Sequence, residues 1–193
     1  MSIGRQMAPE PATRVGVTVT FLRMERPPAA PAPDFPPGYR LVCLAACTVP
    51  YYRYLYNTVG ADYVWWLRRT ATDAELAALL ASHGVSIHVL MHGDEPAGFF
   101  EIDGRQPPIV NLSYFGLMPH AVGHGVGTAF LRAAIDAAWL QDARLVTVNT
   151  CTADHPRALP AYLRAGFVRM RELHEIWDIP LRLGMKIPDR LRV

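Results

Sequence analysis

Residues 122–128, with the sequence VGHGVGT, separate a predicted strand from a predicted helix. The strand is IVNLSYFGLM (109–118), and the helix is predicted over residues 124–140, where apolar residues recur every three and four positions. The glycines at 123, 125 and 127 permit positive φ angles and a close approach of a ligand to the backbone. Because N–H groups at a helix start converge on anions, the segment predicts a pyrophosphate site; a tight turn that binds nothing is the alternative.

Two common phosphate-binding loops do not match this segment. A Walker A loop needs a lysine after its last glycine, whereas Thr128 follows Gly127 directly. A Rossmann loop needs an acid about twenty residues downstream at a strand end. Asp142 has that separation but precedes the predicted strand RLVTVNT (144–150). The segment therefore indicates neither a P-loop NTPase nor a dinucleotide-dependent redox enzyme.

A second segment, HPRALPAYLRAGF (155–167), follows that strand and predicts a helix over residues 156–165. Together with LMPHAVGHGVGTAFL (117–131), it resembles the two signature segments of bacterial members of the GNAT N-acetyltransferase superfamily. The positions that match the family's motifs are Gly125, Gly127, Ala158, Tyr162, Gly166 and Phe167. Two positions depart from the motifs: Val122 stands where the family has Arg or Gln, and His155 where it has Asn.

The resemblance implies an α/β fold (an α+β mixed sheet). Its sheet would be mostly antiparallel and twisted, with a splay between strands four and five of the family's sheet and helices on both faces. The sequence predicts strands at 15–24, 39–47, 86–92, 97–103, 109–118, 144–150, 167–172 and 174–179, and helices within 50–69 and 72–84 and at 124–140 and 156–165. We expect residues 1–14 to form a flexible tail and residues 15–193 a single acyltransferase domain.

Composition limits the possible partners. Lys and Arg number 19 against 17 for Asp and Glu, and a net charge of +2 gives no general electrostatic basis for binding nucleic acid or a membrane. No uncharged apolar run approaches the length of a membrane span. The three cysteines lack disulfide or zinc spacing, and His120 and His124 have no third ligand nearby. We therefore expect a cytoplasmic protein that uses no metal.

The resemblance implies acetyl-CoA (coenzyme A) as co-substrate. Its acetyl group would pass to a primary amine of a small molecule or peptide, by direct attack through a tetrahedral intermediate. The resemblance assigns the phosphate contacts to Val122, Gly123, His124, Gly125, Val126, Gly127, Thr128 and His155. Backbone amides of Leu117 and Met118 would bind the thioester oxygen and stabilise its developing charge. The fold that is implied also permits a homodimer.

Catalysis requires that the amine first lose a proton, because a lysine-like amine has a pKa of about 10.4. The position that aligns with the glutamate base of some relatives is Asn111, which cannot accept a proton. We predict Glu101 on the neighbouring strand as the substitute, with an exposed or ion-paired carboxylate as the alternative. Tyr162 is predicted to protonate the departing thiolate, with a packing role as the alternative.

The aromatic segment PYYRYLYNTVGADYVWWLRR (50–69) lies where members of the family shape the acceptor pocket. We predict that Tyr52, Tyr56 and Trp66 line this pocket together with Asn111, which favours an apolar or aromatic acceptor. Core packing is the alternative for these aromatic residues. The competing function is a non-catalytic acyl-CoA sensor or interaction module, which Val122 and Asn111 favour because both depart from the family's pattern.

Overall fold

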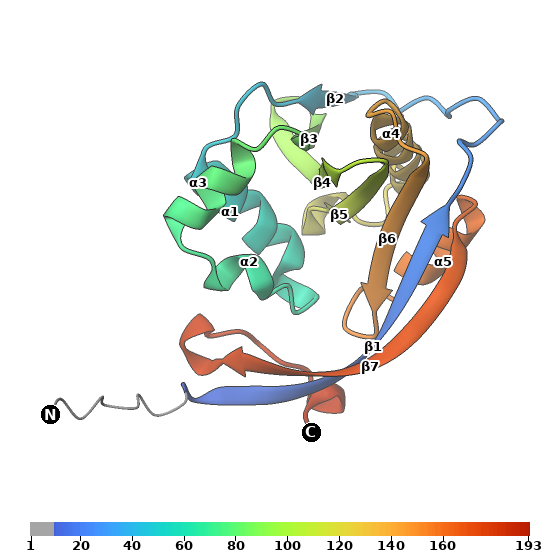
Figure 1. Ribbon diagram of the computed structural model, residues 1–193. Coiled ribbons are helices and arrows are strands. Elements are labelled where there is room, and N and C mark those ends of the chain that lie inside the picture. Colours follow the sequence, from blue (N-terminus) through green and yellow to red (C-terminus); the bar gives the residue numbers. More distant parts are fainter. Residues whose placement is uncertain (1–9) are drawn as a thin grey trace, which may run out of the picture.

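A computed structural model describes residues 10–193, which fold around one seven-stranded sheet of order β2-β3-β4-β5-β6-β1-β7 (Figure 1). The strands are β1 (Ala12–Met24), β2 (Tyr39–Cys43), β3 (Val85–His92), β4 (Glu95–Gln106), β5 (Ile109–Leu117), β6 (Leu145–Cys151) and β7 (Val168–Pro180). The helices are α1 (Val49–Val59), η1 (Gly60–Asp62), α2 (Leu67–Thr70), α3 (Asp73–Leu80), η2 (Pro119–Ala121), α4 (Gly127–Trp139), α5 (Ala158–Arg164), η3 (Leu181–Leu183) and η4 (Asp189–Leu191). The β5–β6 pair is parallel and the other strand pairs are antiparallel, which confirms the predicted fold class.

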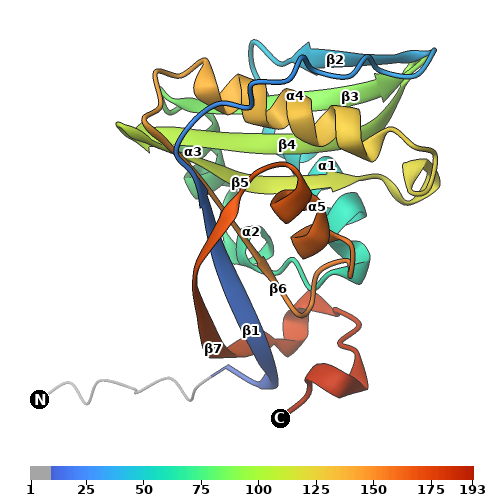
Figure 2. The same cartoon turned by 90° about the vertical axis from the view of Figure 1, so that its right-hand side faces the viewer.

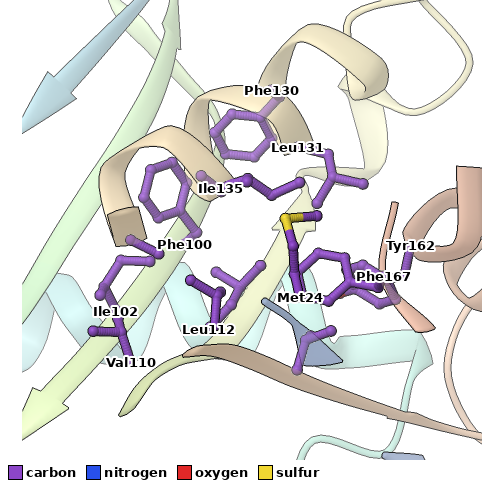
Figure 3. Packing of buried hydrophobic residues seen from close by; sticks show 14 of the residues in the cluster. Met24, Phe100, Ile102, Val110, Leu112, Phe130, Leu131, Ile135, Tyr162 and Phe167 are labelled. Atoms are coloured by element: carbon purple, nitrogen blue, oxygen red, sulfur yellow. The ribbon is translucent and has the colours of Figure 1, made fainter. Parts of the chain in front are cut away.

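Helices cover both faces of the sheet, as predicted (Figures 1 and 2). On one face α1 and α3 bury an apolar cluster against alternate residues of β3 and β4, such as Phe99. On the other face, α4 and α5 pack on the intervening residues of β3 and β4, whose side chains point to the opposite side of the sheet. Figure 3 shows one of these, Phe100 of β4, beside Phe130 and Ile135 of α4. Two buried faces explain why β4 lacks the alternation of apolar and polar residues that a half-exposed strand shows.

The sheet forks between β5 and β6. These strands pair from Ile109 with Leu145 to Leu112 with Val148, and beyond that point their remaining residues have no partner across the gap. Ser113 is an extra residue in β5, because Tyr114 pairs with Glu101 while Leu112 pairs with Ile102. A bulge of this kind bends its strand and ends regular pairing. The predicted splay is therefore confirmed, and Ser113 marks its origin.

The first strand lies inside the sheet, between β6 and β7. Val19 is aligned with Cys151 of β6 on one side and with Leu173 of β7 on the other. Because β1 begins at Ala12, the predicted tail of residues 1–14 is too long, and residues 12–14 belong to the sheet. Residues 1–9 of that tail lie outside the described part of the chain.

Other element boundaries also differ from the predictions. Helix α4 begins at Gly127 and not at 124, because Gly123 and Gly125 have φ angles of 88° and 80°, which no right-handed helix accommodates. The two strands predicted at 167–172 and 174–179 form one continuous strand, β7. The strand predicted at 39–47 ends at Cys43. Helix α5 begins at Ala158, which places Pro160 in its first turn, where no intrahelical N–H bond is lost.

Candidate active site

A cavity of about 890 Å³ runs through the fork between β5 and β6. One part, here called the loop half, is lined by the glycine segment, the start of α4 and helix α5. The other part, the aromatic half, is lined by the segment from η1 to α2 and by β1 and β7, and its aromatic residues are Phe21, Tyr63, Trp65, Trp66, Tyr114 and Trp177. The fork joins the two halves, so a ligand bound in one can reach the other.

The loop half presents the free amino end of a helix. No side chain caps α4, and its first turn contains no acidic residue, so its first N–H groups have no partner within the helix. Side chains built on Gly123 and Gly125 would meet nothing within 4 Å, so glycine is required there by positive φ and not by crowding. Free N–H groups, the helix dipole and open space together form a site for an anion such as a phosphate.

The structure places most of the predicted phosphate-binding residues on this surface: Val122, Gly123, Gly125, Gly127, Thr128 and His155 line the cavity. Two of the predicted residues do not. Val126 is fully buried in the core beneath α4, and His124 is exposed outside the cavity lining. The side chains of Val126 and His124 therefore do not line the loop half.

Two arginines that the sequence analysis did not select also line the loop half. Arg157 and Arg164 lie at the two ends of α5, and neither forms an ion pair within residues 10–193. The amide of Arg157 donates to Nδ1 of His155 at 3.0 Å. His155 thus accepts a backbone N–H at the start of α5, as the amide oxygen of an Asn could.

At the fork, residues 113–117 of β5 have no strand partner on the side that faced β6, because β6 has turned away, while residues 114–117 remain paired with β4 on the other side. Alternate N–H groups of a strand point to opposite sides, so some of these groups face the cavity. Leu117 lines the cavity, as predicted. Met118 does not: it is buried, and its N–H donates to the carbonyl of Ala97 at 2.8 Å. The prediction that the Met118 amide binds a thioester oxygen is therefore wrong.

Tyr162 of α5 and Cys151, the last residue of β6, both line the cavity. Burial raises the pKa of the Tyr162 hydroxyl, and the nearby Asp154 carboxylate raises it further, so the phenol keeps its proton at neutral pH. Burial likewise raises the pKa of the Cys151 thiol to about 12. A protonated thiol is a poor nucleophile, so Cys151 is unsuited to form an acyl-enzyme. Tyr162 is suited to donate a proton.

Asp154 is the carboxylate that the sequence analysis missed. It follows β6 and lines the cavity at the fork, where Oδ2 accepts hydrogen bonds from Thr150 Oγ1 at 2.7 Å and from the Cys151 amide at 2.9 Å. Oδ1 accepts one longer bond, from Trp65 Nε1 at 3.3 Å. Burial raises the pKa of Asp154 in spite of these bonds. The signal in the sequence was an acid three residues after the strand that borders the splay.

Glu101 lies outside the cavity lining and is fully buried behind it. Its Oε1 forms an ion pair with Arg68 Nη2 at 2.6 Å, and its Oε2 accepts a hydrogen bond from the Tyr52 hydroxyl. The Arg68 guanidinium in turn lies 5.3 Å from the ring centroid of Tyr114, which lines the aromatic half. The structure thus supports the ion-paired alternative for Glu101, because both carboxylate oxygens are engaged and neither faces the fork.

We expect Glu101→Gln to lower the free energy of unfolding by about 3 kcal/mol, because removing one partner of a buried ion pair leaves the other charge uncompensated. The estimate is at the low end of the usual range because the Arg68 side chain keeps 26% of its exposure. Urea unfolding at neutral pH measures it. Asp178→Asn, which breaks an exposed pair with Arg14, is the control and should cost at most about 1 kcal/mol. Equal losses in the two variants would contradict the prediction.

The predicted acceptor residues divide between the cavity and the core. Trp66 and Asn111 line the cavity, whereas Tyr52 and Tyr56 are buried residues of α1 in the core and do not line it. Asn111 accepts a hydrogen bond from Thr147 at 3.0 Å and so joins β5 to β6 at one of their last paired positions. For Tyr52 and Tyr56 the packing alternative holds, since their hydroxyl groups bond to protein atoms behind the wall.

Val64, which precedes two aromatic residues of the cavity wall, has an unusual backbone conformation. It is a buried β-branched residue with a φ of 55°, in the left-handed region that such residues rarely adopt. The turn places the two residues that follow, Trp65 and Trp66, against the cavity. Backbone strain of this kind costs on the order of 1–3 kcal/mol and is concentrated at ligand-binding sites.

Within residues 10–193, no group of three His, Cys, Asp or Glu side chains is placed to hold a metal ion. Nor does any helix in that range have both the length and the apolar composition that a membrane-spanning helix requires.

A mixed sheet that forks beside a glycine loop at a helix start defines the acetyltransferase class of α/β proteins. The sequence profile of the Acetyltransferase (GNAT) family matches residues 51–167, more than half of the chain. The protein therefore belongs to the GNAT acetyltransferase family. No curated protein matches the sequence significantly.

Solved structures show the same fold at low sequence identity. A GCN5-related N-acetyltransferase from Sphaerobacter thermophilus has a TM-score of 0.58 and 17% identity, covering 88% of this chain and 53% of its own. One from Kribbella flavida has a TM-score of 0.58 and 17% identity, with 84% and 60% covered. An aminoglycoside acetyltransferase from an uncultured soil metagenomic sample has a TM-score of 0.54 and 14% identity, with 67% and 88% covered. The chain thus spans little more than half the length of the first two.

Proposed function

We propose that the protein transfers the acetyl group of acetyl-CoA to a primary amine of a small molecule or peptide, by direct attack of the amine nitrogen. The observation that carries this proposal is the fork itself, which opens between a phosphate-type loop and a second compartment that contains a carboxylate. Binding the two substrates from opposite halves would bring them together where β5 and β6 separate.

The loop half fits the phosphates of coenzyme A. Amides at the start of α4 and around Gly125 are free to donate, and Arg157 and Arg164 supply positive charge that no carboxylate within residues 10–193 neutralises. Because Val122 does not supply the usual side chain of the motif, these arginines take over part of its electrostatic role. The edge of residues 113–117 that has no strand partner can hydrogen-bond to the pantetheine arm as a further strand would.

Two side chains at the fork are suited to move the protons that the reaction requires. When bound, acetyl-CoA supplies the acetyl group as a thioester. Asp154 accepts a proton from the incoming ammonium, directly or through a water molecule, and frees the nitrogen lone pair. As the new C–N bond forms and the C–S bond breaks, the Tyr162 hydroxyl donates a proton to the departing sulfur. The phenolate recovers the second proton that the nitrogen loses as the amide forms, and Asp154 releases its proton to solvent, so one proton is released for each amide formed.

Thermal unfolding in the presence of acetyl-CoA tests the binding step, because a ligand that binds the native state raises the Tm by mass action. We expect a shift with acetyl-CoA and with CoA, and none with NAD or ATP. An amine screen that detects free thiol then tests turnover. Absence of any CoA-dependent shift would contradict the proposal, and a shift without turnover of any amine would favour the non-catalytic binding module.

A further inference from the structure

Some of the charged residues that line the aromatic half are neutralised within the protein. Arg68 is paired with Glu101 at 2.6 Å, and Asp103 is paired with Arg105 at 2.7 Å. These four residues therefore contribute little net charge to a ligand in the cavity.

Two carboxylates in this half are different. Asp154 and Glu175 line the cavity, and neither takes part in an ion pair within residues 10–193. Arg190, which borders Glu175 in a neighbouring shallow pocket, donates instead to the carbonyl of Thr152 at 2.9 Å. The aromatic half thus carries two carboxylates without a cationic partner, while the loop half carries two unpaired arginines.

Glu175 lies next to the indole ring of Trp177, which in turn packs beside the indole ring of Trp66. Trp177 Nε1 donates to Glu175 Oε2 at 2.8 Å, which orients the carboxylate and leaves Oε1 without a donor in the described part of the chain. The rings of Trp66 and Trp177 are 6.3 Å apart at an interplanar angle of 49°. A carboxylate next to tilted indole rings is a suitable environment for an organic ammonium group, which is attracted both to the charge and to the ring faces.

Asp154 and Glu175 occupy separate positions along the cavity. Asp154 follows β6 at the fork, whereas Glu175 is on β7, and β1 lies between these two strands. Adjacent strands are about 4.8 Å apart, so β6 and β7 are separated by roughly 10 Å. Val19 of β1, which is aligned with Cys151 of β6 and with Leu173 of β7, lines the cavity and places an apolar side chain between these two strands. This separation of the two strands allows the carboxylates to bind two different ammonium groups.

We propose that the acceptor is a diamine or polyamine whose second ammonium group binds at Glu175 against Trp66 and Trp177, separated from the reacting nitrogen by an apolar or aromatic segment. The inference rests on the proposed function, because it assigns the reacting nitrogen to Asp154. Glu175 then determines specificity and binds the part of the acceptor that does not react.

A matched pair of acceptors tests this proposal. 1,4-Bis(aminomethyl)benzene carries two ammonium groups, and 4-methylbenzylamine has the same ring with one. We expect the wild-type protein to prefer the diamine in kcat/KM by at least about tenfold, the effect of one charge-assisted contact. Glu175→Gln should abolish that preference by raising the KM for the diamine, with the rate for the monoamine unchanged, because glutamine can still accept from Trp177.

Asp178→Asn removes the same charge three residues further along β7, where Asp178 is exposed and pairs with Arg14, and it should keep the preference. No preference in the wild type, or an equal loss for both amines in Glu175→Gln, would overturn the inference. If neither amine is acetylated, the proposed function fails for these acceptors, and calorimetry with CoA-saturated protein decides the inference separately. Tighter binding of the diamine that depends on Glu175 supports the subsite, and equal or absent binding overturns it.

Discussion

Asp154→Asn is expected to lower kcat for acetyl transfer by about 100- to 10,000-fold, the usual contribution of a positioned general base. Asn keeps the size of the side chain and can still accept from the Cys151 amide, but it cannot take a proton from the ammonium. The pH dependence should change with it. Because burial raises the pKa of Asp154 and only its ionised form accepts a proton, wild-type kcat/KM should fall as the pH drops through that raised pKa.

The pH profile separates this role from a structural one. In Asp154→Asn the residual rate should lack that acid limb and rise with hydroxide concentration. Glu101→Gln should keep the limb, since Glu101 is engaged by Arg68 and Tyr52 behind the wall. Asp62→Asn, an exposed acid in the neighbouring η1, should leave both rate and profile unchanged. An unchanged acid limb in Asp154→Asn would assign the base to another group.

Gly125→Val is expected to weaken acetyl-CoA binding by about 100-fold or more, equivalent to about 2.7 kcal/mol. Gly125 has a φ of 80° and lines the loop half, and its missing side chain leaves open space. Valine is strained at this φ, and its methyl groups would occupy the space that phosphate oxygens need. Isothermal titration with acetyl-CoA measures the loss.

Gly93→Val is the matched control. Gly93 also has positive φ, at 58°, and open space around it, but it lies in the turn between β3 and β4 and does not line the cavity. Both variants should lose about 1–2 kcal/mol of stability from the left-handed conformation. Only the Gly125 variant should lose affinity, and a similar loss in both would mean that backbone strain, and not the site, weakens binding.

The sequence was most informative where the chemistry is local. The glycine loop could be predicted because positive φ and a free helix start are properties of a few consecutive residues. The resemblance to the family then predicted how the strands and helices are arranged. The place of Tyr162 in the cavity lining could be predicted because this residue lies at a fixed position in a short motif, while its proton transfer stays a prediction. Helix α4 was placed too early because its amphipathic pattern continues into residues whose backbone the glycines turn aside.

Long-range contacts could not be predicted in this way. Glu101 became a buried ion-pair partner because the chain folds Arg68 across it, and nothing in either local sequence indicates that contact. Asp154 lines the cavity because β6 diverges from β5. Glu175 lines it because β7 pairs with β1, a strand about 160 residues earlier in the sequence. Tyr52, Tyr56 and Trp66 all belong to one aromatic segment, and the sequence does not distinguish those in the core from those in the cavity. The distinction depends on how α1 packs on the sheet, which buries Tyr52 and Tyr56 in the core while Trp66 lines the cavity.

The interior position of β1 has a consequence for how the protein is made. This strand is synthesised before the other six strands of the sheet, but its partners, β6 and β7, follow only from residue 145 onward. Contacts so distant in sequence are slow to form, and the nascent strand must wait with its edges unpaired. Val19 and Phe21 therefore join the wall of the cavity late, and the aromatic half, which β1 and β7 help to line, is completed only after β7 has been synthesised.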